Sequence, residues 1–318
     1  MDARILRIGD SALLFAAIVL GTVLAPVIAF VGVPIAAAGV AGLAYRGHTA
    51  VAAFAATAGV AVVGVLSLSD VIYVGPVLAA VVLTVVLLPT RPFQPVAAAL
   101  IAVLALANVS ADALLARSQH TTLPATISQQ SQAVVAEMTK ALGASAPDAV
   151  RALQDAARLV ASAWPSAYFQ SAVLVGVLTI AAVLWAARRV EFSLDVPPLS
   201  RLDLSPHILW AFVAGLFMLA AAYGSFAGSA VIGIVGLNLV LCARTLFLLQ
   251  GMGVAAGMLD RANVGLGGRI LALAALAAFD AFTLVVSFAG LLDLWVNFRR
   301  LPREGATPTV AEPDGRRW

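Results

Sequence analysis

The chain has 318 residues, of which 62% are hydrophobic and 11% are charged, and its formal net charge is +3 at pH 7. A soluble domain of this composition would expose more apolar surface than it could cover, so the composition excludes a soluble protein. The basic residues flank apolar blocks and do not gather in one patch, which argues against nucleic-acid binding.

Long apolar blocks without Lys, Arg, Asp or Glu dominate the first third of the chain: Ser11–Tyr45, Thr49–Leu68, Val71–Leu88 and Pro95–Val109. A helix of about 20 apolar residues crosses the ~30 Å hydrocarbon layer, and lipid offers no water to a non-helical backbone. The sequence therefore predicts an all-α polytopic transmembrane bundle in contact with the lipid bilayer.

The first apolar block would be about 52 Å long as a single helix, at about 1.5 Å per residue. Pro26, Gly32 and Pro34 interrupt this block, which favours a hairpin of two spans. The N-terminal region, residues 1–116, is thus expected to hold five spans, near residues 11–26, 28–45, 50–68, 71–89 and 95–115.

Polar and charged residues return between residues 117 and 165, which predicts an extramembrane connector. Ser145 is suited to cap a helix whose first turn contains Pro147 and Asp148. Apolar residues then recur at steps of three and four, which is typical of an amphipathic helix. Two interpretations stay open: a helix that packs on the bundle or on lipid headgroups, or a helix that docks a partner protein.

Four more spans are expected in residues 166–300, near 167–187, 207–223, 229–258 and 268–296, and the last residues, 301–318, form a disordered polar tail. The total is about nine spans, eight to nine. Basic residues mark the breaks on one side of the membrane: Arg4 and Arg7, Arg46, Arg91, Arg188, Arg189 and Arg201, and Arg261 and Arg269.

The positive-inside rule makes that side cytoplasmic and the connector extracytoplasmic. The breaks at Gly32, Asp70 and Tyr223–Gly228 contain no Arg or Lys, as expected for the opposite side. A count of nine spans, however, would place Arg299, Arg300 and Arg303 outside, against the rule. Either one span is miscounted or the tail breaks the rule.

Ionised side chains inside the spans are the best candidates for a site, because each costs about 2.5–3.5 kcal/mol at the bilayer centre. Arg244 lies in the middle of the 229–258 span, with Asn238 and Gln250 on either side, and Asp280 lies near the middle of the last span. An Arg244–Asp280 pair would offset both costs. This pair could join two helices, or it could belong to a ligand or substrate cavity bordered by Asn238, Arg244, Gln250 and Asp280.

Motifs of soluble chemistry do not occur in the sequence. It has no G-x-x-x-x-G-K-[ST], C-x-x-C, H-E-x-x-H or G-x-S-x-G, and its three His residues lie in three different breaks. We therefore expect no enzymatic activity, no cofactor and no metal site. An ATPase that works in the same process would have to be another chain.

The C-terminal run from Gly290 to Arg300, GLLDLWVNFRR, together with Leu249-Gln250-Gly251 and Asn238, resembles the end of the YybS-like family of predicted multi-pass bacterial membrane proteins. The resemblance implies a multi-pass protein of the bacterial cytoplasmic (inner) membrane. It also suggests a distant kinship to the substrate-binding subunits of energy-coupling-factor transporters, and therefore a partner membrane subunit or an ATPase on another chain.

Residue by residue, the pattern of this family marks Asn238, Gln250, Gly251, Asp293, Phe298 and Arg299. Asn297 stands where relatives commonly have an acid. The group Asp293, Asn297, Arg299 and Arg300 is expected to act as a terminal anchor or as a docking surface for a partner.

Two functions of different classes remain. The first is a substrate-binding or transport-associated membrane subunit. The second is a non-transporting membrane scaffold that recruits proteins through its 124–164 helix and its tail. An intramembrane enzyme has less support, since no pair of carboxylates and no nucleophile–base spacing is present.

Overall fold

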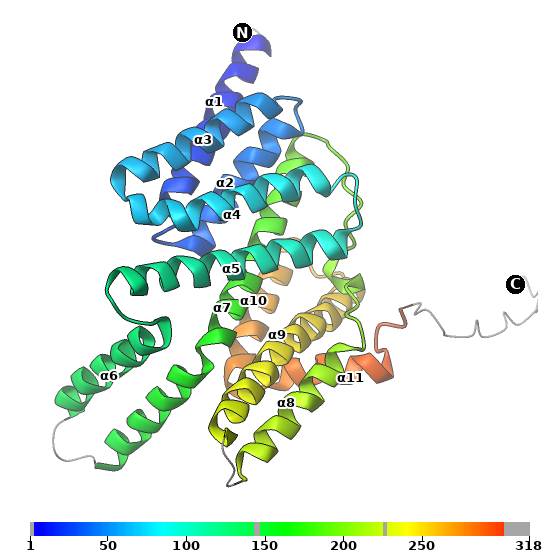
Figure 1. The fold of residues 1–318 in the computed structure, drawn as a ribbon. Coiled ribbons are helices and arrows are strands. Elements are labelled where there is room, and N and C mark those ends of the chain that lie inside the picture. Colours follow the sequence, from blue (N-terminus) through cyan, green and yellow to red (C-terminus); the bar gives the residue numbers. More distant parts are fainter. Residues whose placement is uncertain (1–2, 143–146, 225–227, 302–318) are drawn as a thin grey trace, which may run out of the picture. The chain divides into compact units, whose positions relative to one another are not determined.

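The computed structural model describes residues 3–142, 147–224 and 228–301. All regular structure in these residues is helical, which confirms the predicted all-α class (Figure 1). The α-helices are α1 (Ala3–Leu24), α2 (Ala29–Ala44), α3 (Thr49–Leu66), α4 (Leu68–Leu87), α5 (Phe93–Ser118), α6 (Leu123–Leu142), α7 (Pro147–Arg189), α8 (Ile208–Ala222), α9 (Ser229–Arg261), α10 (Leu266–Thr283) and α11 (Val285–Val296), and a short 3-10 helix, η1 (Leu199–Arg201), precedes α8.

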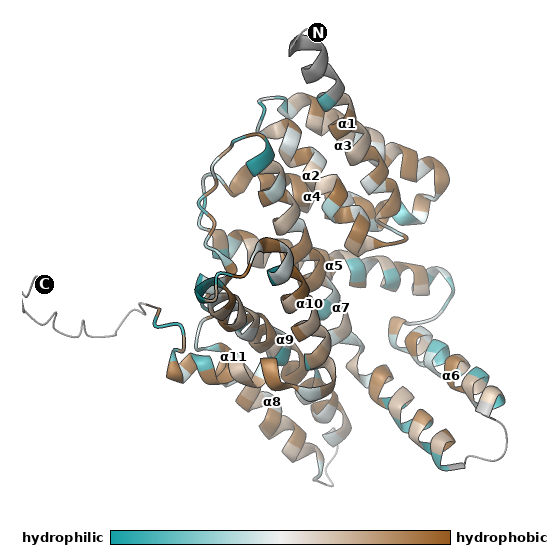
Figure 2. Cartoon of the chain, turned by 180° about the vertical axis from the view of Figure 1, so that it is seen from behind, coloured by the Kyte–Doolittle hydropathy of each residue, from teal (hydrophilic) through white to brown (hydrophobic). Residues whose placement is uncertain are grey.

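Ten of the described helices are apolar. Six of them, α3, α4, α5, α7, α9 and α10, are long and apolar enough to cross a membrane, and four shorter ones are α1 from Asp10, α2, α8 and α11. Figure 2 shows hydrophilic residues concentrated in connecting segments, in α6 and in the first half of α7. The helices agree with the predicted spans, including the hairpin of α1 and α2.

The last predicted span, 268–296, is not one helix. It is divided into α10 and α11 at Leu284, whose φ of 60° lies in the left-handed region. The residues around this break contain neither Gly nor Pro, so local sequence gave no reason to expect it. The ten apolar helices still correspond to about nine predicted spans, because α10 and α11 share one.

The predicted connector contains two helices. The helix expected at Pro147 and Asp148 is α7, which continues through Pro165 to Arg189 and so joins the connector to the following span. Ser145, the predicted cap, lies outside the described residues, as does nearly all of the predicted tail. Figure 1 shows α6 and the first half of α7 as a helical hairpin.

By their contacts, the residues form two compact units. Unit 1 contains residues 1–196 and 212–242, and unit 2 contains residues 197–211 and 243–318. In unit 1, α1 packs on α2 and α3, α2 on α4 and α7, and α5 on α4 and α7. The core is apolar, with Ile18, Leu43, Leu104 and Val183 fully buried. Unit 2 contains α10, α11, the second half of α9 and the segment around η1.

Candidate functional site

The break between α10 and α11 is organised by the buried carboxylate of Asp280. Its Oδ1 accepts the Ser287 N–H at 2.8 Å, and its Oδ2 accepts the Ser287 hydroxyl at 2.6 Å. Ser287 lies in the first turn of α11, where backbone N–H groups have no partner within the helix. Asp280 therefore caps α11 from the preceding helix and helps to hold Leu284 in its left-handed conformation.

Arg244, in the middle of α9, binds the same break. Its Nη2 donates to the Asp280 carbonyl at 3.0 Å and to Asp280 Oδ2 at 3.3 Å. Asp280 is fully buried, whereas 32% of the Arg244 side chain remains exposed. The predicted ion pair is thus present, and it lies at the break between α10 and α11, which it helps to stabilise. Its use as a ligand site remains a prediction.

A second polar cluster, the C-terminal network, consists of Asp203, Gln250, Asp293 and Arg299 in unit 2. Gln250 Nε2 donates to Asp203 Oδ1 and to Asp293 Oδ2, both at 2.9 Å, and its Oε1 accepts the Leu204 N–H at 3.1 Å. Arg299 donates to Asp293 Oδ2 through Nη2 at 2.7 Å and through Nε at 3.1 Å. Gln250, Asp293 and the Arg299 side chain are almost completely buried.

The network also binds the segment before α8. Arg299 Nη1 donates to the carbonyls of Ser200 at 3.2 Å and Leu202 at 2.6 Å, and Nη2 lies 3.6 Å from Asp203 Oδ1. The planar guanidinium, with donors in fixed directions, suits several acceptors at once. The network thereby joins three segments far apart in sequence: 200–204, α9 and the end of α11.

Glycines let α11 approach α9 closely. A Cβ at Gly251 would lie 2.0 Å from the Val286 carbonyl oxygen, and a Cβ at Gly290 would lie 1.9 Å from the Phe247 carbonyl oxygen. The two backbones are therefore in direct contact, as is common where membrane helices cross at small residues.

Asn238, the remaining residue of the predicted cavity border, belongs to unit 1, and its hydrogen bonds are with residues of that unit. Its Oδ1 accepts the Ser166 N–H at 2.9 Å, and its Nδ2 donates to the carbonyls of Ser162 and Ile234, both at 2.8 Å. Ser162 and Ser166 are four apart in α7, next to Pro165, so the amide inserts into the hydrogen-bond ladder of that helix. Side chains inserted in this way produce helix kinks.

The predicted anchor group is divided between the interior and the surface. Asp293 and Arg299 are buried in the network, whereas Arg300 is exposed. Asn297, at φ 50°, ends α11, and its side chain exchanges two hydrogen bonds with the Leu301 backbone, at 2.8 and 2.9 Å. Sequence reasoning missed Asp203, because an acid in a connecting segment gives no signal.

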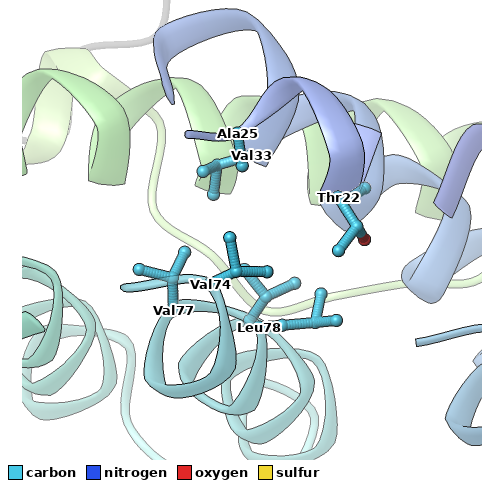
Figure 3. Close-up of a pocket in the computed structure, with 8 residues that line it drawn as sticks. Thr22, Ala25, Val33, Val74, Val77 and Leu78 are labelled. Atoms are coloured by element: carbon cyan, nitrogen blue, oxygen red, sulfur yellow. The ribbon is translucent and has the colours of Figure 1, made fainter. Parts of the chain in front are cut away.

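Unit 1 contains a small apolar pocket between α1, α2 and α4 (Figure 3). Its lining includes Ala25, Val33, Val74 and Leu78. Thr22 also lines the pocket, and its hydroxyl donates a hydrogen bond to the Ile18 carbonyl at 2.6 Å. The pocket therefore offers no polar group to orient a solute.

Comparison with known families agrees with the helical membrane architecture. The family model described as "Predicted membrane protein (DUF2232)" matches residues 13–294. The chain belongs to the DUF2232 family of predicted membrane proteins. No curated protein and no solved structure matches the chain. The DUF2232 match includes Arg244, Asp280, Gln250 and Asp293 but ends before Arg299.

Proposed function

We propose that this DUF2232 protein is a substrate-binding or transport-associated subunit of the bacterial cytoplasmic membrane, and that it takes a small solute with a carboxylate or phosphate group. The observation that supports the proposal is the position of Arg244 in the middle of an apolar helix, beside a helix break, with a third of its side chain exposed. No catalytic step is assigned to this chain.

A partly exposed arginine at that depth needs polar surroundings, because a charge at the bilayer centre costs about 2.5–3.5 kcal/mol. The hydrogen bonds from Arg244 to Asp280 are both donated by Nη2. Its other donors, Nε and Nη1, have the fork geometry that suits a carboxylate or a phosphate. Interrupted helices near the middle of the membrane are also the usual setting of solute sites in transporters.

Kinship with the substrate-binding subunits of energy-coupling-factor transporters, which the YybS-like C-terminal pattern suggests, belongs to the same proposal. A subunit of that kind would depend on a partner membrane subunit or an ATPase on another chain. It would also be expected to bind its solute without the partner, which makes the proposal testable on the isolated chain.

The test measures thermal unfolding of the purified full chain in detergent with a panel of small carboxylates and phosphates. A ligand present at about 100 times its Kd stabilises the folded state by about 2.7 kcal/mol, which raises the midpoint by several degrees. We expect at least one compound to do so for the wild type and for Arg300→Gln, but not for Arg244→Gln. The cap of α11 is kept in Arg244→Gln, because the Asp280 carboxylate still accepts the Ser287 N–H and hydroxyl.

Exchange of the two charges would be a poorer test. Arg244→Asp with Asp280→Arg preserves the pair, but an arginine at position 280 cannot accept the Ser287 N–H. The double variant would damage the cap of α11 whatever the function.

A membrane scaffold is the second candidate, and the α6–α7 hairpin favours it. Four large apolar side chains on this hairpin are exposed, namely Val134, Met138, Leu159 and Val160. A scaffold predicts that no compound of the panel changes the unfolding midpoint of the wild type, which would refute the solute-binding proposal.

A further inference from the structure

Helix α11 is the shortest of the ten apolar helices in the described residues. Its 12 residues would be about 18 Å long, against about 30 Å for the hydrocarbon layer. Its exposed residues nevertheless include Val285, Phe288, Leu292 and Trp295, which are all apolar. Its other face lies against α9 at Gly290. A helix with this pattern is suited to lipid on one side and protein on the other.

Helix α10 starts at the Arg261 end of α9. A tight turn joins the two helices: Val264 N–H donates to the Leu259 carbonyl at 3.1 Å, and Arg269 Nε donates to the Val264 carbonyl at 2.7 Å. Arg269 also forms an ion pair with Asp260. These contacts hold the first turn of α10 beside the last turn of α9.

The far end of α10 reaches only the middle of α9. Asp280 is bound to Arg244, and Leu284 follows one turn later. Beyond Arg244, α9 continues to Ser229 for about 22 Å at about 1.5 Å per residue. The contacts of α10 therefore accompany only the half of α9 between Arg244 and Arg261.

The end of α11 returns to the Arg261 end of α9. Arg261 Nη2 donates to the Phe298 carbonyl at 3.4 Å. Arg299 lies over α9, since a Cβ at Gly253 would be 2.9 Å from Arg299 Nη1 and one at Gly257 would be 3.7 Å from Arg299 Cγ. In Figure 2, α10 and α11 are two limbs that meet at a bend.

We infer that α10 and α11 form a re-entrant hairpin, which enters and leaves the membrane on the same side and has its tip at Leu284. The C-terminal network fastens the returning limb to the segment 200–204, and the Arg244–Asp280 pair fastens the tip. This device is independent of whether the chain binds a solute.

The hairpin removes the conflict in the charge pattern. Eight helices then cross the membrane, α1–α5 and α7–α9, and the chain ends on the side where it began. Arg299 and Arg300 lie on the same side as Arg201, Arg261 and Arg269, as the positive-inside rule requires. The buried Asp280 carboxylate and the partly exposed Arg244 guanidinium then lie near the tip.

Single-cysteine labelling with a membrane-impermeant maleimide tests the hairpin. In a Cys242→Ser background, Ala262→Cys reports the turn between α9 and α10, and Tyr223→Cys reports the end of α8 on the opposite side. We expect Ala306→Cys, after α11, to be labelled in the same vesicle orientation as Ala262→Cys. We expect Phe282→Cys, near the tip, to lose labelling at least tenfold relative to both references.

Labelling of Ala306→Cys together with Tyr223→Cys would overturn the inference, as would strong labelling of Phe282→Cys in the orientation that labels Tyr223→Cys. A protease-cleavable tag after Trp318 of the otherwise unchanged chain gives the same answer without a cysteine at position 306. Cleavage only in vesicles that label Ala262→Cys supports the hairpin, and cleavage only in the other orientation contradicts it.

Discussion

The helices of unit 1 and the helices of unit 2 are held together by different kinds of side chain. The buried charged residues among the described ones, Asp280, Asp293 and Arg299, all belong to unit 2. The core of unit 1 is made of aliphatic residues, alanine and Tyr73, with Gly21 on α1 and Gly32 on α2 at close backbone contacts. Apolar side chains gain little when they move from lipid to protein, so unit 1 depends on close packing.

Unit 2 has fewer packed helices and depends instead on hydrogen bonds to buried charges. Such bonds are directional, so they can fix the position of a short helix such as α11 against α9. They also make the unit sensitive to the loss of a single partner, because the remaining charge is left without compensation. The comparison therefore predicts that the loss of a buried polar partner destabilises unit 2 more than unit 1. Replacement of a glycine at a close backbone contact should destabilise both units.

The largest effect is expected for Arg299→Ala. The buried Asp293 and the carbonyls of Ser200 and Leu202 would lose a common donor. Removing one partner of a buried pair costs about 3–5 kcal/mol. Thermal unfolding in detergent should show a much lower midpoint for this variant. Arg300→Ala, at the exposed neighbouring position, should stay within about 0.5 kcal/mol of the wild type. Equal midpoints for the two variants would contradict the role assigned to the network.

A smaller effect is expected for Gly290→Ala. The added Cβ would meet the Phe247 carbonyl oxygen, so α11 must move away from α9. Overpacking of this kind costs about 1–3 kcal/mol. The matched control is Gly267→Ala in α10, where a Cβ would meet nothing within 4 Å. In unit 1, Gly32→Ala should behave like Gly290→Ala, because its Cβ would lie 2.4 Å from the Ala25 nitrogen. A neutral Gly290→Ala would show that the backbones are not in contact.

Much of the fold follows from sequence because a membrane span needs a continuous apolar run. The same physics predicted the Arg244–Asp280 pair, since two ionised groups in lipid must find each other. The break at Leu284 could not be predicted, because its cause is a long-range contact of Asp280 and not a local Gly or Pro. The role of Asp203 could not be predicted for a similar reason. This residue lies in a connecting segment, and its contacts with Gln250 and Arg299 exist only in the folded chain.

The smallest effect is expected in unit 1, for Asn238→Leu. The amide of Asn238 accepts the Ser166 N–H and donates to the Ser162 carbonyl, two groups that would bond to each other in a regular helix. Without it, these two groups can pair with each other, so α7 should straighten and the loss should be only about 1–2 kcal/mol. Asn108→Leu is the matched control, because within the described residues the Asn108 amide donates to the Leu104 carbonyl of its own helix and to no other helix.

The change in α7 can be measured by the distance between spin labels at Asp148→Cys and Arg188→Cys, placed on the two limbs in a Cys242→Ser background. Straightening predicts a longer distance in Asn238→Leu and an unchanged one in Asn108→Leu. An unchanged distance in both would mean that Pro165 alone produces the kink, since proline removes a helical donor whatever lies opposite. In that case unit 1 would rely on packing alone, and the contrast with the charge-bound unit 2 would be sharper still.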